Sequence, residues 1–386
     1  MSEKKTDKLK FHFFEYALYW LVTGAIALLA IPVLIFKFFA YLISSASAPF
    51  KSTKNFIGLS ILLLLISVGY ISYMVFVPIE LGVEVRSVMV DENDQFRVIA
   101  KRFHQSGMIT SEYLFRAVAI LKRVDKNILP GRYDFTGKVS ILDVLWKIKK
   151  HDIATLLLTI PEGATIFKIG SIMAGNLGMD SSAFVNRVAD TSFALNKYNL
   201  PGLEGYLFPE TYLFWLGIKM DGIIDMLVGE FYRKTAGILD SCPTNHLSPK
   251  EVLVLASIIE AEALHEDEMP SISSVYHNRL RISMMLQADP TVNYALGGIF
   301  RPLKYDDLKL ISPYNTYGQT GLPPGPINSP GLAAIKAALN PAKTDFLYFV
   351  ADGLGRHIFS KTLEEHNRAK FNIRRLRKLS EKNHGV

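Results

Sequence analysis

The segment SPKEVLVLASIIEAEAL, residues 248–264, carries the clearest local structural signal in the chain. Ser248 can cap a helix, Pro249 suits the first helical position, and Glu251 stands three residues after the cap, which is the capping-box pattern. An almost wholly apolar run follows and ends at Glu260. We therefore expect a buried helix with a carboxyl group near its far end.

Glu260 is the strongest candidate for chemistry. Apolar surroundings remove water from a carboxyl group, which favours its neutral form and raises its pKa. A carboxylic acid that stays protonated near neutral pH can act as a general acid, the state that glycosidic cleavage requires. The alternative is that the helix simply emerges into water at this residue. Glu262 lies about 200° further round the helix, so we do not expect both carboxylates to point into one site.

Two uncharged hydrophobic runs mark the N-terminal part of the chain. Residues 56–77 are long enough to cross a hydrocarbon core of about 30 Å and predict a transmembrane helix. Residues 16–36 are interrupted by Pro32, so they could either span the membrane or lie in its interface. Lysines precede each run in similar number, and the sequence therefore leaves the number of spans open.

The composition describes a folded protein and excludes several classes. Of 386 residues, 49% are hydrophobic and 20% charged, which excludes a disordered chain. The one cysteine, Cys242, excludes an intramolecular disulfide and any cysteine-based zinc or iron–sulfur site. The chain has no Walker A lysine motif, Rossmann glycine fingerprint or GxSxG elbow. With a net charge of +7, the basic segment around Arg374 is expected to be solvated surface, and nucleic acid is the least favoured partner.

The chain after Pro78 is expected to form a mixed α+β region. A weak similarity between residues 90–100 and 160–170 predicts two strand–helix–helix units. Three further helices are expected: one that begins near Met269, one capped by Asp289 and one capped by Ser329. The turn at 352–353 predicts a β-hairpin.

Several loop residues combine amide, acid and phenol groups. This mixture suits a sugar, whose hydroxyl groups need donors and acceptors and whose ring faces stack on aromatic side chains, although turn-stabilising polar residues and core tyrosines would look the same. The acidic residues 265–268 are expected to be a solvated surface and not a metal site. The sugar-binding candidates are Gln287, Asp289, Tyr314, Asn315 and Tyr317.

Seven short motifs, each weak by itself, occur in an order that is specific as a set. Over residues 85–370 this set resembles the YceG-like family of membrane-anchored endolytic murein transglycosylases. The motifs are LEGYLFPETY at 203–212, ASIIE at 256–260, NRL at 278–280, LQADPTV at 286–292, SPYNTY at 312–317, GLPPGPI at 321–327 and YFVADG at 348–353.

The resemblance implies an α+β protein with a transmembrane anchor. It divides the chain into a cytoplasmic tail and membrane region at 1–80, a small LysM-like module at 81–152 and a catalytic domain at 153–386. Glu260 falls on the family's catalytic glutamate, and Gln287 and Asn315 are implied to line the glycan cleft. Glu204, in the first motif, joins the other candidates as an expected substrate contact. No cofactor and no metal are expected.

The implied reaction is cleavage of the MurNAc–GlcNAc β-1,4 bond in nascent glycan strands, which leaves 1,6-anhydroMurNAc ends and stops elongation. The implied partners are peptidoglycan strands, the cytoplasmic membrane and synthases of the elongation machinery, with the catalytic domain on the extracytoplasmic side. The sequence departs from the family at Ala261, where lysine is usual, at residues 276–277, and in the extra run at 16–36. A non-catalytic peptidoglycan-binding scaffold and a hydrolytic muramidase stay open as alternatives.

Overall fold

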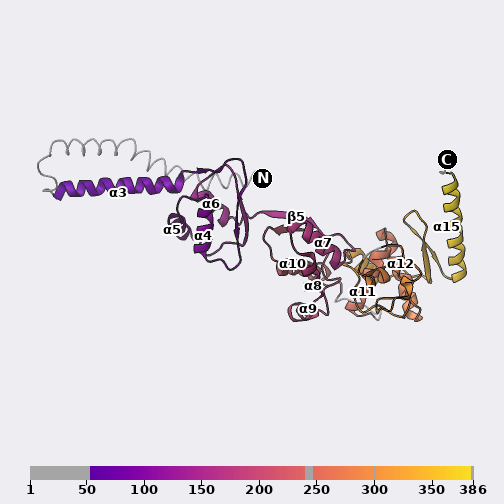
Figure 1. Ribbon diagram of the computed structural model, residues 1–386. Coiled ribbons are helices and arrows are strands. Elements are labelled where there is room, and N and C mark those ends of the chain that lie inside the picture. The colour runs from indigo at the N-terminus through magenta and orange to yellow at the C-terminus, as the bar shows by residue number, and fades with distance from the viewer. Residues whose placement is uncertain (1–52, 240–246, 299–300, 384–386) are drawn as a thin grey trace. The chain divides into compact units, whose positions relative to one another are not determined.

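The computed structural model describes residues 53–239, 247–298 and 301–383 (Figure 1). The hydrophobic run at 16–36 and Cys242 lie outside these residues. The chain forms two compact units, one of residues up to Leu156 together with Trp215–Ile218, and one of Leu157–Phe214 together with the residues from Lys219 onward.

The hydrophobic run at 56–77 is a helix, as predicted. Helix α3, Thr53–Phe76, contains the apolar window Gly58–Phe76, of which only 11% is buried. By length and composition this helix is long and apolar enough to cross a membrane. Its C-terminal end contacts the rest of the first unit, where the Thr110 hydroxyl donates to the Met74 carbonyl over 3.2 Å.

The first unit packs helices α4, α5 and α6 with two short sheets around one hydrophobic core, in which aromatic rings cluster. Phe103 lies at its centre, with its ring centroid 5.7 Å from that of Phe115 and 6.5 Å from that of Tyr133. The sheets are antiparallel pairs, β1 with β4 and β2 with β3. The elements are β1 Ile79–Glu80, β2 Arg86–Val90, α4 Phe96–Gln105, α5 Glu112–Leu121, β3 Gly131–Phe135, β4 Lys138–Val139 and α6 Ile141–Lys149.

The second unit is mostly helical. Strand β5 pairs with β6, and β7 pairs antiparallel with β8 as the predicted hairpin. The orders β2–α4–α5 and β5–α7–α8 confirm the two predicted strand–helix–helix units. The first elements are β5 Thr155–Thr159, α7 Ile166–Leu177, α8 Ser181–Ala189, α9 Thr191–Tyr198, β6 Thr211–Trp215 and α10 Met220–Thr235. The later ones are α11 Pro249–Glu262, η3 Glu266–Glu268, α12 Met269–Arg281, α13 Asp289–Ala295, η4 Asp307–Lys309, α14 Leu332–Leu339, β7 Tyr348–Ala351, β8 His357–Ser360 and α15 Leu363–Asn383.

Helix α11 forms the centre of the second unit. Its capping box is present as predicted: the Ser248 hydroxyl accepts from the Glu251 N–H, and the Glu251 carboxylate accepts from the Ser248 N–H over 2.8 Å. Every residue from Val252 to Ile259 is buried. The helix packs most extensively against α14, whose buried alanines allow two helix backbones to approach closely.

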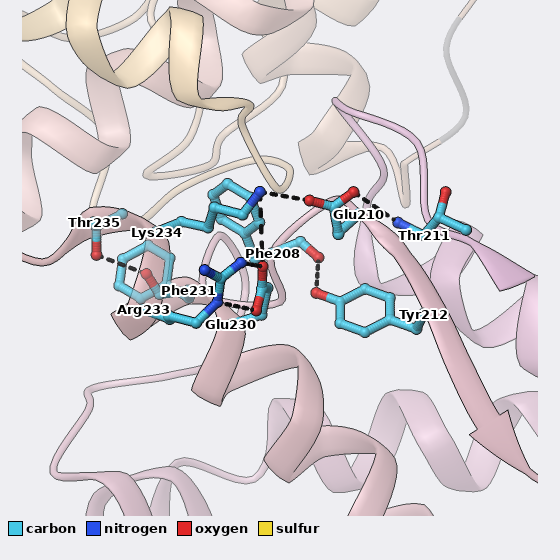
Figure 2. A network of polar contacts seen from close by, with 9 residues as sticks. All are labelled: Phe208, Glu210, Thr211, Tyr212, Glu230, Phe231, Arg233, Lys234 and Thr235. Atoms are coloured by element: carbon cyan, nitrogen blue, oxygen red, sulfur yellow. Dashed lines mark hydrogen bonds and ion pairs between the residues drawn. The ribbon is translucent and has the colours of Figure 1, made fainter.

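A polar network ties α10 to the start of β6 (Figure 2). The Lys234 ammonium lies 2.6 Å from the Glu210 carboxylate, which also accepts from the Thr211 N–H. Arg233 pairs with Glu230 on the same helix. These contacts hold the chain near Glu210, whose carbonyl accepts from the Ile160 N–H over 2.9 Å.

Two predicted helix caps are wrong. Helix α14 begins at Leu332 with Gly331 as its N-cap, because the Ser329 backbone instead forms an antiparallel bridge with Ala164. Asp289 is the first residue of α13 and not its cap, and its carboxylate accepts from the Tyr317 hydroxyl over 2.5 Å. In both cases the expected capping residue instead contacts a partner distant in the sequence.

We expect Ser248→Ala to lower the free energy of unfolding by about 1 kcal/mol, because two backbone N–H groups at the start of α11 lose their acceptors or their geometry. Urea unfolding followed by circular dichroism measures the change. Ser248→Thr, which keeps the hydroxyl, is the matched control and should stay close to the wild type. Equal losses in the two variants would contradict the assignment of the stabilisation to the cap.

Candidate active site

Glu260 lies in the last turn of α11 and is half-buried. The pKa of its carboxyl is raised to about 7, chiefly because burial disfavours the charged form and to a smaller extent because the carboxylates of Glu162 and Glu266 do the same. The Gly331 N–H donates to Oε2 over 2.9 Å and opposes this shift, because it stabilises the anion. None of the ion pairs between residues that the structure describes involves Glu260. The group is therefore an acid that can exist in both protonation states near neutral pH.

The position of Gly331 is determined by contacts to α11. The Ser257 hydroxyl donates to the Val254 carbonyl and accepts from the Ile327 N–H over 3.1 Å. The Asn328 side-chain amide donates to the Ser257 carbonyl over 2.8 Å. The segment before α14 therefore runs along α11, and this alignment brings the Gly331 N–H to the carboxyl of Glu260.

The turn between β5 and α7 lies against the same carboxyl group. The Gly163 N–H donates to the Ser329 carbonyl, and the Ser329 N–H donates to the Ala164 carbonyl, each over 2.9 Å. Gly163 has a φ of +70°, and a Cβ built on it would lie 3.6 Å from Cγ of Glu260. The turn therefore packs on the side chain of Glu260.

The side chain of Glu204, from the segment between α9 and β6, reaches the N-terminus of α7. Its carboxylate accepts from the Ile166 N–H over 3.2 Å and also from Tyr294 and the Gly205 backbone. Burial raises its pKa to about 8. The ring of Tyr294 lies 5.0 Å from that of Tyr314 between centroids, so the predicted residues Glu204 and Tyr314 share one neighbour.

Glu262 has partners different from those of Glu260. Its Oε1 accepts from the Tyr276 hydroxyl on α12 over 3.1 Å, and burial raises its pKa to about 7. Glu260 instead bonds to Gly331, ahead of α14. The two carboxyl groups of α11 thus serve different contacts, as their spacing on the helix predicts.

The loop candidates fall into two kinds. Asn315 is 3% exposed, and its amide donates to the carbonyls of Leu308 and Leu310 while its oxygen accepts from the Tyr317 N–H. It therefore braces the loop. Gln287 is exposed, has a φ of +48°, and donates its N–H to the Thr316 carbonyl over 3.1 Å.

The structure brings some of the predicted residues together. The Tyr317 hydroxyl donates to the Asp289 carboxylate. The Gln287 N–H donates to the carbonyl of Thr316, which lies between Asn315 and Tyr317 in the sequence. Within the described ranges, no hydrogen bond joins Glu260 to any of the six predicted substrate contacts.

Two residues that affect Glu260 are not predicted from the sequence. Gly331 donates a hydrogen bond to its carboxyl, and the charge of Glu162 raises its pKa. Their sequence signals are weak: Glu162 lies within the segment 160–170 of the internal similarity, and Gly331 follows Ser329, the expected cap, by two residues. Among residues 53–239, 247–298 and 301–383, no cluster of three or more His, Cys, Asp or Glu side chains could hold a metal ion. In the acidic segment at 265–268, Glu268 is buried and accepts from the His357 backbone and ring.

Comparison with known proteins places this geometry in context. Residues 88–372 match the YceG-like family. A Bacillus subtilis (strain 168) protein named endolytic murein transglycosylase is 32% identical over 301 residues, which are 74% of this chain and 83% of that protein. A Streptococcus pneumoniae serotype 2 (strain D39) protein of the same name is 28% identical over 345 residues, 80% of this chain and 62% of that protein. The crystal structure of a yceG-like protein from Listeria monocytogenes aligns with a TM-score of 0.52 and 31% identity, over 74% of this chain and 99% of that chain.

The raised pKa of Glu260 predicts a pH-dependent cost to stability. Between its ordinary value of 4.5 and about 7, the unfolded chain loses a proton that the folded chain keeps, so the free energy of unfolding falls as pH rises through this window. Glu260→Gln removes the loss. We expect the variant to match the wild type at pH 4 and to exceed it by up to about 3 kcal/mol at pH 8. Urea unfolding at several pH values measures the difference, and a difference that did not change with pH would contradict the burial of this acid.

Proposed function

The chain belongs to the YceG-like family, and from this premise we propose that it is an endolytic murein transglycosylase, a lyase that cleaves the MurNAc–GlcNAc β-1,4 bond within peptidoglycan strands. The observation that carries the proposal is the carboxyl of Glu260, whose pKa of about 7 lets it both give and take a proton near neutral pH. The chemistry needs no resident cofactor.

In the first step, protonated Glu260 donates its proton to the glycosidic oxygen. The bond from that oxygen to C1 of MurNAc breaks, and positive charge develops at C1 as in an oxocarbenium ion. Burial of the carboxyl supports this step because it keeps the acid protonated before the bond breaks.

In the second step, the Glu260 carboxylate accepts the proton of the muramoyl 6-hydroxyl. The 6-oxygen then bonds to C1 and closes a 1,6-anhydro ring, so no water is consumed and Glu260 regains its proton. Between the two steps the Gly331 N–H stabilises the anion. One carboxyl can serve both steps because the nucleophile belongs to the substrate and is already close to C1.

We assign the six loop candidates to the glycan-binding surface in two roles. Gln287 and Asp289, both exposed, and the half-buried Tyr317 would contact the sugar hydroxyls and ring faces. The contacts of Asn315, Tyr314 and Glu204 support roles in holding that surface in shape.

We further propose that α3 anchors the enzyme in the cytoplasmic membrane with the following residues on the extracytoplasmic side, where murein lies. In this arrangement residues 81–152 are a LysM-like module, residues 153–386 are the catalytic domain, and cleavage of nascent strands ends their elongation by membrane-bound synthases. The length and the apolar composition of α3 support its assignment as a membrane anchor.

Glu260→Gln should lower transglycosylase activity by at least ~10²-fold, because the variant cannot donate or accept the proton. Digests of purified murein analysed by mass spectrometry measure the product, since an anhydro end is one water lighter than a hydrolysed end. Unchanged circular dichroism controls for folding. Substantial anhydro product from Glu260→Gln would contradict the role of this residue, hydrolysed ends from the wild type would favour a muramidase, and intact strands would favour a binding scaffold.

A reporter that is active only in the cytoplasm, fused after Val386, should stay inactive, because the proposed substrate requires an extracytoplasmic catalytic domain. A fusion of the same reporter to the N-terminus is the companion measurement, and its signal reports whether residues 16–36 add a second span. Strong activity of the C-terminal fusion would contradict the murein assignment.

A further inference from the structure

A second carboxyl group, that of Glu162, lies directly against Gly331. A Cβ built on Gly331 would overlap the Glu162 carboxyl and would lie 3.0 Å from its Cγ. The N–H of the same glycine donates to Glu260. Two carboxyl groups from segments far apart in the sequence therefore meet at one residue that has no side chain.

Backbone contacts hold the turn that carries Glu162. The Ile160 N–H donates to the Glu210 carbonyl on one side, and the Gly163 N–H donates to the Ser329 carbonyl on the other, each over 2.9 Å. Neither contact uses the Glu162 side chain. A substitution of this side chain should therefore leave the turn in place.

The charges around this pair of acids are negative. The charges of Glu162 and Glu266 raise the pKa of Glu260. The charges of Glu266 and Glu210 raise the pKa of Glu162. Glu210 is itself paired with Lys234, which offsets its charge. Burial, Glu266 and Glu210 raise the pKa of Glu162 as well. The charge of Glu162 in turn opposes the ionisation of Glu260.

We propose that Glu162 is a positioning residue for Glu260: held against Gly331, its carboxylate disfavours negative charge on Glu260 and keeps the acid protonated. The catalytic meaning of this effect rests on the proposed function, whereas the electrostatic effect itself does not. Glu162 thus supplies the second carboxyl group that Glu262, bonded to Tyr276, does not supply. It acts on the proton of Glu260 and not as a base for water.

Glu162→Gln tests this inference, because the amide keeps the shape of the side chain and removes its charge. The readout is the titration of Glu260 in the full-length protein, followed by NMR of ¹³C-carboxyl-labelled glutamate and assigned by the signal missing in Glu260→Gln. We expect the titration midpoint to move to lower pH. In the pH–activity profile, the alkaline limb should move the same way, so that activity at pH 8 relative to pH 5.5 falls up to ~10-fold.

Glu364→Gln is the matched control. Glu364 lies on α15, pairs with Arg368 and is 84% exposed at its side chain, so its neutralisation removes the same charge from the second unit without touching the site. The titration midpoint of Glu260 and the pH–activity profile should both stay at their wild-type positions.

Gly331→Ala provides a second, independent variant. Its φ of −72° is compatible with alanine, but the new methyl group would displace the Glu162 carboxyl. We expect a smaller shift of the Glu260 midpoint in the same direction. In a Glu162→Ala background, where nothing is displaced, Gly331→Ala should add no further shift, and this double-mutant cycle isolates the contact.

An unchanged Glu260 midpoint in folded Glu162→Gln would overturn the inference. Loss of activity at every pH with an unchanged midpoint would also overturn it, since Glu162 would then act on the substrate directly. Failure of the proposed function has a different signature: the wild type would produce hydrolysed ends or none, while the shift in the Glu260 titration would persist.

Discussion

The hydrogen bond from the Gly331 N–H to the Glu260 carboxyl joins the end of one helix to the start of another. It exists because the first N–H groups of a helix have no partner within that helix, so the N-cap of α14 has a donor to spare. The packing of α11 against α14 decides where this donor points. A side chain at Gly331 would meet the Glu162 carboxyl, so the absence of a Cβ is part of the same constraint.

The features that could be predicted from the sequence are those whose signals are local. The start of α11 follows from Ser248, Pro249 and Glu251, and the hairpin of β7 and β8 follows from a turn between two apolar runs. The apolar run before Glu260 correctly predicts a buried acid, although the Gly163 turn and Gly331, both distant in sequence, complete its surroundings. For the helix start and the hairpin, the residues that determine the feature lie within a few positions of it.

The features that could not be predicted depend on partners distant in sequence. Ser329 has the pattern of a cap, but a bridge to Ala164 uses its backbone. Asp289 likewise meets the Tyr317 hydroxyl. In the sequence, Glu162 looks like an ordinary acidic residue of a turn, and only the fold places its carboxyl against Gly331. A single sequence contains no signal for such contacts, because each of them depends on which distant segment the fold brings alongside.

An acid that must both release and recover one proton is limited by the weaker of the two transfers. A strongly raised pKa would keep the acid protonated and make its carboxylate a good base for the return, but it would weaken the acid as a donor. An ordinary pKa of 4.5 would make a stronger donor, but the group would be ionised near neutral pH and its carboxylate would be a weaker base. Glu260 is held between these limits, since burial and the neighbouring carboxylates favour the acid while the Gly331 N–H favours the anion. For the proposed reaction this balance matters more than either contribution alone, because the hydrogen bond that lowers the pKa also stabilises the carboxylate between the two steps.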